Sequence, residues 1–319
     1  MDFKIGKENA DRIAIGLSIF FLILYVLFRE PILGVLCAIF LVIAVVLEVA
    51  QGVRERGWKE ELKDTVITIG AIVVVWLALS FALRTSSPLN AVVSCSMLPN
   101  LERGDLVVIY GEGIRAPEIE ASEQDVARLS NANAVVEWEG KSEEVKGSAL
   151  SACATESHEF CAYLFNYPSK VVEKRGNFEF HYGTCYRKGV KKGAKEGFVP
   201  CLQRIEYKDY IVIDNRGGDV VVYAPKPSDA FSRVGDIIHR AMLKIKTESN
   251  EYYIIKGDNN EIADIQIYSG FGGNSIVERS QIKGKVIARV PILGYLRLFL
   301  SGYVEEDPGC SYNLNIVAY

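Results

Sequence analysis

Near its N-terminus the chain carries three apolar stretches: IAIGLSIFFLILYVLF at residues 13–28, ILGVLCAIFLVIAVVLEV at 32–49 and VITIGAIVVVWLALSFAL at 66–83. Each is close to the ~17–25 residues that a helix needs to cross a ~30 Å hydrocarbon core. Polar residues and a proline at 29–31 separate the first two, which predicts a tight helical hairpin. A cleaved signal peptide is disfavoured, because the first stretch lacks a clear small-residue cleavage site and two more apolar stretches follow it.

Basic residues predict which way the three helices point. The hairpin between the first two spans has only Arg29. The N-terminal tail and the 51–64 loop hold most of the other basic residues of this region, namely Lys4, Lys7, Arg12, Arg54, Arg56, Lys59 and Lys63. Positively charged loops stay in the cytosol, so the tail and the 51–64 loop are expected inside. With three spans, everything after about residue 84 is expected on the extracytoplasmic side of the cell membrane, in a multi-pass protein.

The composition narrows the classes of function. The 319 residues are 49% hydrophobic and 24% charged with a net charge of −4, so nucleic acid is not an expected partner. The sequence has neither a phosphate-binding loop nor a dinucleotide fingerprint. It also has no C-x-x-C pair, and its three histidines lie far apart, so no metal and no organic cofactor are expected.

Four cysteines gather in one polar region, at Cys153, Cys161, Cys185 and Cys201. If that region lies outside the cytosol, two disulfides are expected, with three possible connectivities. The alternative is four free or buried thiols.

Beyond residue 84, short β-branched and aromatic runs predict a mostly-β domain. Strands are expected at 106–110, 210–213, 220–223, 252–255 and 285–290, with a turn at 215–219 and a helix near 118–128. We therefore predict an α+β protein, in which N-terminal transmembrane helices precede a mostly-β extracytoplasmic domain with a large insertion.

The expected domains are a three-span anchor at 1–84, a catalytic β domain in two parts at 85–111 and 207–300, a Cys-containing inserted subdomain at 112–206, and a C-terminal tail at 301–319. The basic run RKGVKKGAK at 187–195 is expected to be a solvated loop of the insert. The segment VPILGYLRLFL at 290–300 is too short to span a bilayer, and we expect a strand followed by a segment on the membrane surface.

Two separated segments supply a nucleophile and a base. Ser96 lies in SCSMLP at 94–99, and a serine hydroxyl becomes a good nucleophile only when a base removes its proton. His239 ends an apolar run in the predicted β core, where a neutral imidazole can accept that proton. The other two histidines, His158 and His181, are expected to be surface residues.

A third segment supplies acids. KGDNNEIAD at 256–264 directly follows a predicted strand and offers Asp258 and Asp264, either of which could orient the imidazole. Taken singly, each segment also has an ordinary interpretation: a loop serine, a structural histidine and an Asx-rich turn.

Taken together, the three segments resemble the signal peptidase I family. SCSMLP, followed by RGD at 103–105, looks like its nucleophile segment. GDVVVY at 218–223 and IHR at 238–240 are similar to its base segment, and KGDNN at 256–260 closely matches its acid segment. The bacterial branch uses a lysine where this chain has His239, so the histidine points to the archaeal and endoplasmic-reticulum branch.

The resemblance covers roughly residues 84–111 and 207–296, about a third of the chain, and implies a serine endopeptidase. By that match, Ser96 would be the nucleophile and His239 the general base. Asp264 would be the preferred orienter of His239, and Asp258 would support the site. The backbone N–H of Ser96 and the hydroxyl of Ser94 would form the oxyanion hole.

The chain departs from the family pattern at two positions. Cys95 stands where the family usually has glycine, next to the nucleophile, which puts the local backbone geometry in doubt. Ala263 and Asp264 stand where the family usually has a pair of acids, which narrows the choice to Asp264.

The resemblance also implies the partners. The expected substrates are secreted precursors with small residues at the −1 and −3 positions from the cut. The physical reason is that an extended peptide pairing with a strand edge places alternate side chains in shallow pockets. Membrane lipid is a second expected partner, and association with the protein-export translocon stays open.

Three alternative readings remain. Cys95 could be a cysteine-peptidase nucleophile acting with His239, since a thiolate is intrinsically the better nucleophile. The chain could instead be a membrane-anchored adhesion or accessory subunit, although it retains the serine, histidine and aspartate that an inactive relative would be expected to lose. A self-cleaving repressor-like peptidase is disfavoured, because that class is cytosolic and lacks three spans.

Overall fold

The chain folds into two compact units. The computed structural model describes residues 10–131, 133–191, 193–194, 196–214, 216–269 and 272–317. The first unit contains the residues up to Val93 together with 103–107 and 289–307. The second contains 94–102, 108–288 and the residues from Pro308 onward. Each unit is therefore assembled from segments that are distant along the chain.

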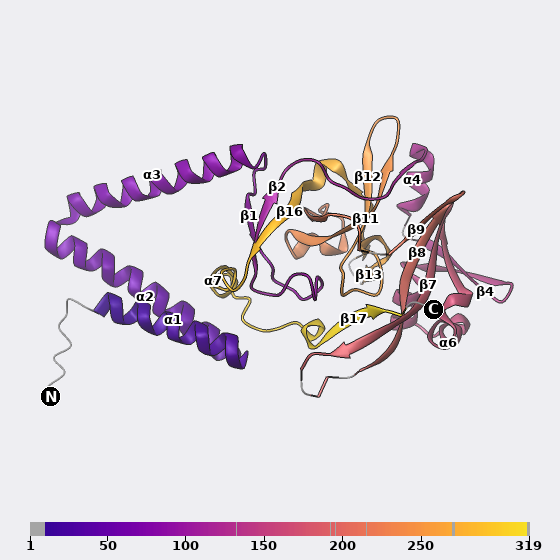
Figure 1. Ribbon diagram of the computed structural model, residues 1–319, viewed down its shortest axis with the longest axis horizontal. Coiled ribbons are helices and arrows are strands. Elements are labelled where there is room, and N and C mark those ends of the chain that lie inside the picture. The colour runs from indigo at the N-terminus through magenta and orange to yellow at the C-terminus, as the bar shows by residue number, and fades with distance from the viewer. Residues whose placement is uncertain are drawn as a thin grey trace. The chain divides into compact units, whose positions relative to one another are not determined.

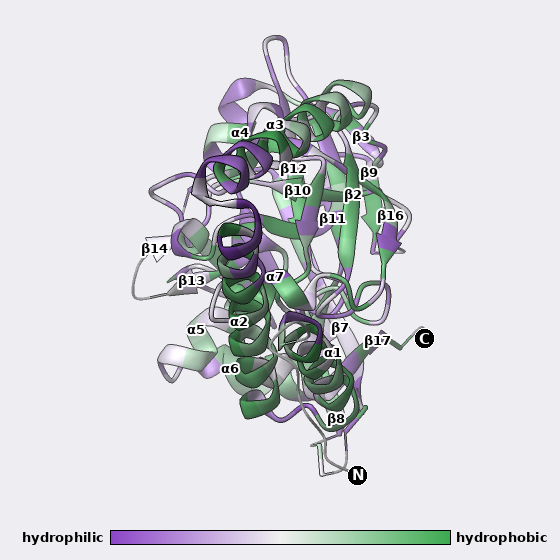
Figure 2. Cartoon of the chain, turned by 90° about the vertical axis from the view of Figure 1, so that its left-hand side faces the viewer, coloured by the Kyte–Doolittle hydropathy of each residue, from purple (hydrophilic) through white to green (hydrophobic). Residues whose placement is uncertain are grey.

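Three long helices dominate the first unit: α1 (Ala10–Phe28), α2 (Pro31–Arg56) and α3 (Trp58–Ala82). All three are long and apolar enough to cross a membrane, and Figure 2 shows hydrophobic residues along most of α1 and α2. The first two predicted spans lie within α1 and α2, and the third, at 66–83, ends one residue beyond α3. The predicted loop at 51–64 is wrong, because both helices continue into it and the chain reverses at Gly57, whose φ is +87°. The basic residues Lys4 and Lys7 lie outside the described residues.

The first unit also contains β1 (Leu89–Ala91) and a short helix, α7 (Tyr295–Leu300). The strand expected within 290–300 is wrong, because β16 (Ile282–Val290) ends at Val290 and the helix α7 follows it. The ring of Tyr25 on α1 packs edge-on against Tyr295 and Phe299, with centroids 5.2 and 4.7 Å apart. Gly34 of α2 makes room for this packing, because a Cβ there would lie 2.8 Å from the Phe299 ring. One face of the segment is thus buried against helices.

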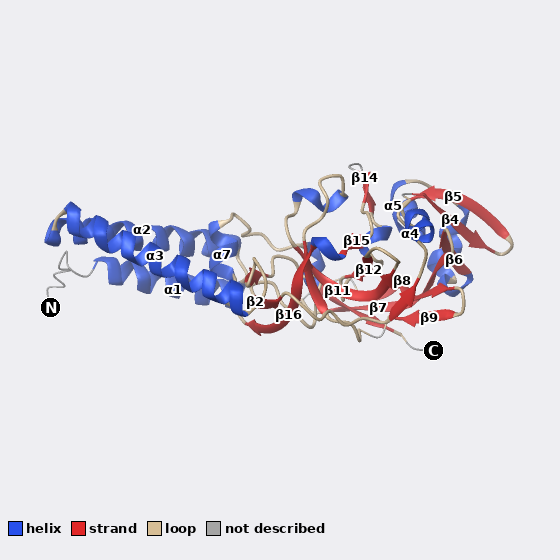
Figure 3. Ribbon diagram, turned by 90° about the horizontal axis from the view of Figure 1, so that it is seen from above, coloured by secondary structure: helices blue, strands red, loops and turns tan. Residues whose placement is uncertain are grey.

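The second unit is mostly β, in contrast to the helical first unit (Figure 3). Strands of its first sheet follow the order β2-β16-β10-β11-β12-β15, with β3 parallel to β11. The neighbours from β16 to β15 pair antiparallel. The strands are β2 (Leu106–Tyr110), β3 (Glu118–Glu120), β10 (Val220–Tyr223), β11 (Ile237–Lys246), β12 (Glu251–Lys256), β15 (Val277–Glu278) and β16 (Ile282–Val290). The five predicted strands at 106–110, 210–213, 220–223, 252–255 and 285–290 are all confirmed.

A second sheet occupies most of the predicted insert and follows the order β5-β4-β6-β7-β8-β9, while β17 pairs with β7 (Figure 1). Its strands are β4 (Asn133–Trp138), β5 (Lys141–Lys146), β6 (Val171–Arg175), β7 (Phe178–Gly189), β8 (Gly197–Tyr207), β9 (Tyr210–Ile213) and β17 (Tyr312–Ile316). Short helices α4 (Glu123–Leu129), α5 (Ala149–Thr155) and α6 (Glu159–Asn166) accompany it, and β13 (Tyr268–Ser269) pairs with β14 (Gly272–Gly273). The basic run at 187–195 lies partly outside the described residues, as does the predicted turn at 215–219.

The predicted helix at 118–128 is partly wrong, because 118–120 form β3 and the helix begins after Ser122. The Ser122 side chain accepts a hydrogen bond from the Asp125 N–H at 3.1 Å, which satisfies a backbone donor at the start of α4. The predicted fold class, α+β with apolar N-terminal helices before a mostly-β domain, is confirmed.

The two sheets of the second unit share one hydrophobic core. Phe180 and Leu202 from the insert pack in the same cluster as Leu243 and Ile254 of the first sheet. The insert therefore shares part of its core with the first sheet, and it also has a hydrophobic cluster of its own that includes Trp138 and Phe160.

Three disulfides close segments of the second unit. They join Cys153 to Cys161, Cys185 to Cys201 and Cys95 to Cys310. The first two use the four clustered cysteines, so the prediction of two disulfides there is confirmed. The third was not predicted, because nothing in the local sequence links residues 215 positions apart.

A close approach at Gly218 generates a prediction. A Cβ at this position would lie 1.9 Å from the Ala241 carbonyl oxygen, on the strand that carries His239. Gly218→Ala should lower the free energy of unfolding by about 1–3 kcal/mol, since overpacking forces backbone shifts. The measurement is thermal unfolding of the detergent-solubilised full chain. Gly197→Ala is the control, because a Cβ there meets nothing within 4 Å. Equal melting temperatures for both variants would contradict the tight packing.

Candidate active site

The nucleophile segment forms a compact turn whose side chains point in different directions. Met97 is buried, whereas Ser96 is half-buried. The turn is closed by hydrogen bonds from Leu98 N–H to the Cys95 carbonyl at 3.2 Å and from Leu101 N–H to the Met97 carbonyl at 3.0 Å. The burial of Met97 anchors the turn, and the hydroxyl of Ser96 is left accessible to a base.

His239 links the nucleophile to an acid. It lies on β11 directly opposite Val221 of β10 and is 5% exposed. Its Nε2 lies 2.8 Å from the Ser96 Oγ, and its Nδ1 lies 2.8 and 2.9 Å from the two carboxylate oxygens of Asp264. Both ring nitrogens are thus used, one toward a hydroxyl and one toward a carboxylate.

Asp264 is the carboxylate that contacts His239. It opens the short 3-10 turn η4 (Asp264–Gln266), which follows β12, and its side chain is 2% exposed. The Tyr223 hydroxyl donates to its Oδ2 at 2.8 Å, and the Asn274 side chain donates to its backbone carbonyl at 2.9 Å. Burial, followed by the charge of Asp264, raises the pKa of Tyr223 well above its ordinary value. Tyr223 therefore remains a hydrogen-bond donor to the carboxylate.

Asp258 has a different position. It is buried, and its two oxygens accept from the Arg240 guanidinium at 2.7 Å each. The Asn100 side chain donates to Asp258 at 2.6 Å. Asp258 thus ties the nucleophile segment to the residue that follows His239. A bidentate charge-assisted pair of this kind fixes geometry strongly.

Asn259 connects the acid segment to both the nucleophile segment and the C-terminal tail. Its backbone N–H donates to the Ser96 carbonyl at 2.7 Å, and its side chain donates to the Cys95 carbonyl at 3.1 Å. The same side chain donates to the Tyr312 carbonyl at 3.0 Å and accepts from the Leu314 N–H at 2.7 Å. These bonds, with the Cys95–Cys310 disulfide, hold the nucleophile against the tail.

The disulfide bears on the alternative nucleophile. The sulfur of Cys95 is bonded to that of Cys310, so it carries no thiolate in this state. Ser96 has the contact to His239. The structure therefore does not support a cysteine peptidase at this position.

Ser94, the predicted second oxyanion donor, lies beside the nucleophile. It is exposed, and its Oγ lies 3.0 Å from the Oγ of Ser96. This hydroxyl can turn toward an oxygen that develops negative charge next to Ser96.

Several contacts of the site were missed from the sequence. Tyr223 is the last residue of the GDVVVY motif at 218–223, and no role in the site was predicted for it from the sequence. The pairing of its strand with the strand of His239 would have indicated that it lies near the imidazole. Val221 lies opposite His239 in the register, so Tyr223 falls on the same face as the imidazole. The roles of Asn259 and Asn274 had no local signal, because both act on backbone groups.

His158 and His181, which were predicted to be surface residues, are half-buried. Their side chains are only 13% and 14% exposed. His158 lies 2.8 Å from Glu143, and burial lowers the pKa of His181. The sequence pattern did not indicate this burial, because the burial of both histidines results from the packing of the insert.

One group of side chains in the insert has metal-ligand geometry. Ligand atoms of Glu179, His181 and Glu206 all lie within 4.8 Å of one another. Arg204 donates to Glu206 at 2.6 Å, and Lys174 lies 3.3 Å from Glu179. The two carboxylates therefore already have cationic partners.

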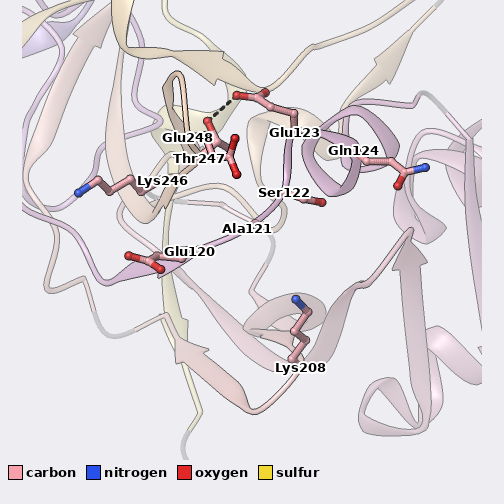
Figure 4. Close-up of a pocket in the computed structure, with 9 residues that line it drawn as sticks. All are labelled: Glu120, Ala121, Ser122, Glu123, Gln124, Lys208, Lys246, Thr247 and Glu248. Atoms are coloured by element: carbon pink, nitrogen blue, oxygen red, sulfur yellow. Dashed lines mark hydrogen bonds between the residues drawn. The ribbon is translucent and has the colours of Figure 1, made fainter.

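A pocket of about 660 Å³ lies elsewhere in the unit (Figure 4). It lies between the start of α4 and the turn after β11, and Lys208 and Lys246 contribute cationic side chains to its wall. The Glu123 carboxylate is already occupied by hydrogen bonds from Thr247, Ser249 and Tyr252. The described lining residues do not include Ser96, His239 or Asp264, so the pocket is separate from the candidate site.

A hydroxyl, an imidazole and a buried carboxylate in one hydrogen-bonded line are the arrangement of a serine hydrolase. The comparisons with known proteins agree with this class. The chain is 36% identical over 84 residues to the signal peptidase complex catalytic subunit SEC11 of Verticillium alfalfae, covering 26% of this chain and 45% of that protein. It is 37% identical over 109 residues to SEC11 of Metarhizium robertsii, covering 32% and 58%. It is 32% identical over 88 residues to SEC11 of Sclerotinia sclerotiorum, covering 28% and 47%.

The chain spans about half the length of the curated relatives that it matches. No protein-family model matches it. The predicted resemblance to the endoplasmic-reticulum type of the signal peptidase I family is confirmed by these relatives.

The two carboxylates can be separated by experiment. Asp264→Asn should slow phosphonylation of Ser96 by a fluorophosphonate probe by about 10³–10⁴-fold, because the imidazole loses the acceptor that sets its tautomer. Asp258→Asn should slow it far less. Its main effect should be a loss of stability of up to about 3 kcal/mol, because the half-buried Arg240 loses its charged partner. Labelling rates and melting temperatures of both variants are the measurements. A larger rate loss for Asp258→Asn would reverse the assignment.

Proposed function

We propose that this chain is a membrane-bound serine endopeptidase that removes N-terminal signal peptides from secreted precursors. The observation that carries the proposal is the hydrogen-bonded line from Asp264 through His239 to Ser96. The SEC11 relatives are named as catalytic subunits of a signal peptidase complex, which supports this substrate class.

The mechanism follows from the contacts. Ser96 Oγ attacks the scissile carbonyl while His239 Nε2, 2.8 Å away, takes its proton and later gives it to the leaving amine. Asp264 holds the Nδ1–H tautomer and stabilises the imidazolium that forms. The Ser96 N–H and the Ser94 hydroxyl would bind the oxyanion, and such a donor typically contributes about 3–4 kcal/mol.

Water then completes the reaction. His239 removes a proton from a water molecule that attacks the acyl group on Ser96, and it passes that proton to Ser96 Oγ as the ester bond breaks and the carboxylic acid product is released. The site thereby returns to its starting state. Small residues at the −1 and −3 positions of the precursor are expected for an extended peptide that pairs with a strand edge.

Three features support an extracytoplasmic catalytic domain. Three helices can cross a membrane, and an odd number of spans carries the chain to the other side of it. The basic residues Arg54 and Arg56 lie at the end of α2, which favours a cytosolic position for that junction. The three disulfides fit an oxidising compartment.

We propose the functional division accordingly: an anchor at 1–84, a catalytic domain at 85–111 and 207–300, an insert at 112–206 and a tail at 301–319. Preproteins and membrane lipid are the proposed partners, and the protein-export translocon is a further candidate. The chain is proposed to lie in the cell membrane.

The test is cleavage of a purified preprotein by the full chain reconstituted in lipid vesicles. Ser96→Ala should lower the cleavage rate at least about 10³-fold, and Ser94→Ala about 10²–10³-fold. Ser142→Ala is the matched control, because Ser142 is exposed on β5 of the insert, and it should cleave like the wild type. A preprotein with a bulky −3 residue should resist cleavage. Undiminished cleavage by Ser96→Ala would refute the proposal.

A further inference from the structure

The 3-10 turn that begins with Asp264 ends with a residue that has a different set of partners. Gln266 is completely buried. Its Oε1 accepts from the Ala263 N–H at 3.0 Å, which closes the turn across the position of Asp264. The shape of the turn, and with it the direction of the Asp264 carboxylate, depends on where the Gln266 amide is held.

The other end of that amide is held by the inserted subdomain. Nε2 of Gln266 donates to Glu173 Oε2 at 3.0 Å and contacts the Tyr182 hydroxyl at 3.1 Å. Glu173 lies on β6 and Tyr182 on β7, both in the second sheet. The insert therefore contributes polar contacts that reach the turn of the catalytic acid.

Glu173 is a fixed point. It is 0% exposed, and its carboxylate accepts from Arg175 Nε at 2.9 Å, from Ala149 N–H at 3.2 Å and from the Tyr182 hydroxyl at 2.5 Å. Arg175, itself buried, also donates to the Gly147 carbonyl at 2.5 Å. Burial, followed by the charge of Glu173, raises the pKa of Tyr182 well above its ordinary value, so its hydroxyl stays a donor. A buried charge with this many partners has little freedom to move.

The insert also holds the neighbouring backbone. The Ser151 hydroxyl of α5 donates to the Gln266 carbonyl at 3.2 Å, and the Leu202 N–H of β8 donates to the Glu261 carbonyl at 2.7 Å. Ile265 packs in the core cluster that contains Leu202. Contacts from α5, β6, β7 and β8 thus converge on the segment 261–266.

We propose that Glu173 and Gln266 are positioning residues through which the inserted subdomain sets the Asp264 carboxylate against His239. The proposal rests on the function proposed above for Ser96, His239 and Asp264. Neither residue contacts Ser96 or His239 directly. The insert affects the reaction rate because it fixes the 3-10 turn that begins with Asp264. Residues that support a catalytic group through hydrogen bonds commonly act in this way.

The chain provides a matched control for the test. Gln281 ends another 3-10 turn, η5 (Arg279–Gln281), where its Oε1 accepts from the Glu278 N–H at 2.9 Å and its Nε2 donates to the Ala224 carbonyl at 3.0 Å. Gln266→Met and Gln281→Met therefore remove the same amide from the same kind of turn. Only the first turn carries the acid that contacts His239.

The first experiment compares these two full-length variants in lipid vesicles. Gln266→Met should lower kcat by about 10–100-fold with KM within about 2-fold, because Asp264 acts on the imidazole and not on substrate binding. Gln281→Met should keep kcat within about 3-fold of the wild type. Rates are normalised to the fraction of chains that fluorophosphonate labels at Ser96 at completion. Equal kcat values for the two variants, or a change confined to KM, would overturn the proposal.

A second variant gives a pH-dependent readout. Gln266→Glu places a carboxylate beside that of Glu173, and two carboxylates that share a site cannot both ionise without cost. At low pH the introduced carboxyl group shares a proton with Glu173, and this proton replaces the hydrogen bond that the Gln266 amide donated. At high pH both carboxylates are charged, and their repulsion displaces the turn that carries Asp264. Activity relative to the wild type should therefore fall as pH rises. Because the readout is the change of this ratio with pH and does not involve Gln266→Met, it remains informative if Gln266→Met does not fold. A ratio that is flat with pH would count against the proposal.

The initial rate of Ser96 labelling by fluorophosphonate separates this proposal from the proposed function. Labelling needs the triad but no signal peptide. If Gln266→Met labels more slowly than the wild type, the positioning role is supported even when the wild-type chain cleaves no preprotein. The absence of cleavage would then end only the substrate assignment. A labelling rate and a cleavage rate that are both indifferent to Gln266 would overturn the positioning role.

Discussion

The hydrogen bond from the Asn259 N–H to the Ser96 carbonyl, at 2.7 Å, is the contact on which the rest of the site depends. It joins the acid segment to the nucleophile segment, which lies more than 150 residues earlier in the numbering. With the Asn259 side-chain bond to the Cys95 carbonyl, it fixes the backbone of Ser96, whose hydroxyl lies 2.8 Å from His239. Asp258 strengthens the same junction, because it binds both Arg240 and Asn100. A general-base mechanism requires this degree of preorganisation, since its rate falls steeply with misplacement.

The two neighbouring carboxylates show how environment divides one residue type between two tasks. Asp264 accepts from His239 and from Tyr223, and can therefore respond to a charge that appears on the imidazole. Asp258 is held in a bidentate pair with Arg240, and its charge is already compensated. Buried ion pairs of this second kind fix geometry more than they add stability.

The insert and the residues from Pro308 onward belong to the second unit, which also contains Ser96, His239 and Asp264. β17 of the tail pairs with β7 of the insert, while Cys310 is bonded to Cys95 beside the nucleophile. At the other end of the Ser96–His239–Asp264 line, Gln266 links the turn that begins with Asp264 to Glu173 of the insert. The site is thus held from both sides by residues that lie outside the segments resembling known signal peptidases. A chain with this architecture can vary its insert only in ways that preserve those contacts.

The sequence by itself determined the apolar helices, five of the strands and the candidate residues, because these are local properties: the length of an apolar run, alternation of β-branched residues and short motifs. The residues themselves left both Asp258 and Asp264 open as the orienter, and only the family resemblance preferred Asp264. The sequence also missed the Cys95–Cys310 disulfide and the role of Glu173. Those features depend on which distant segments become neighbours, and only the tertiary fold decides that. His181 shows the same limit, because its burial comes from packing of the insert rather than from the residues beside it. The sequence indicates which side chains can act as nucleophile, base or acid. Which residues these side chains contact is decided by the packing of distant segments.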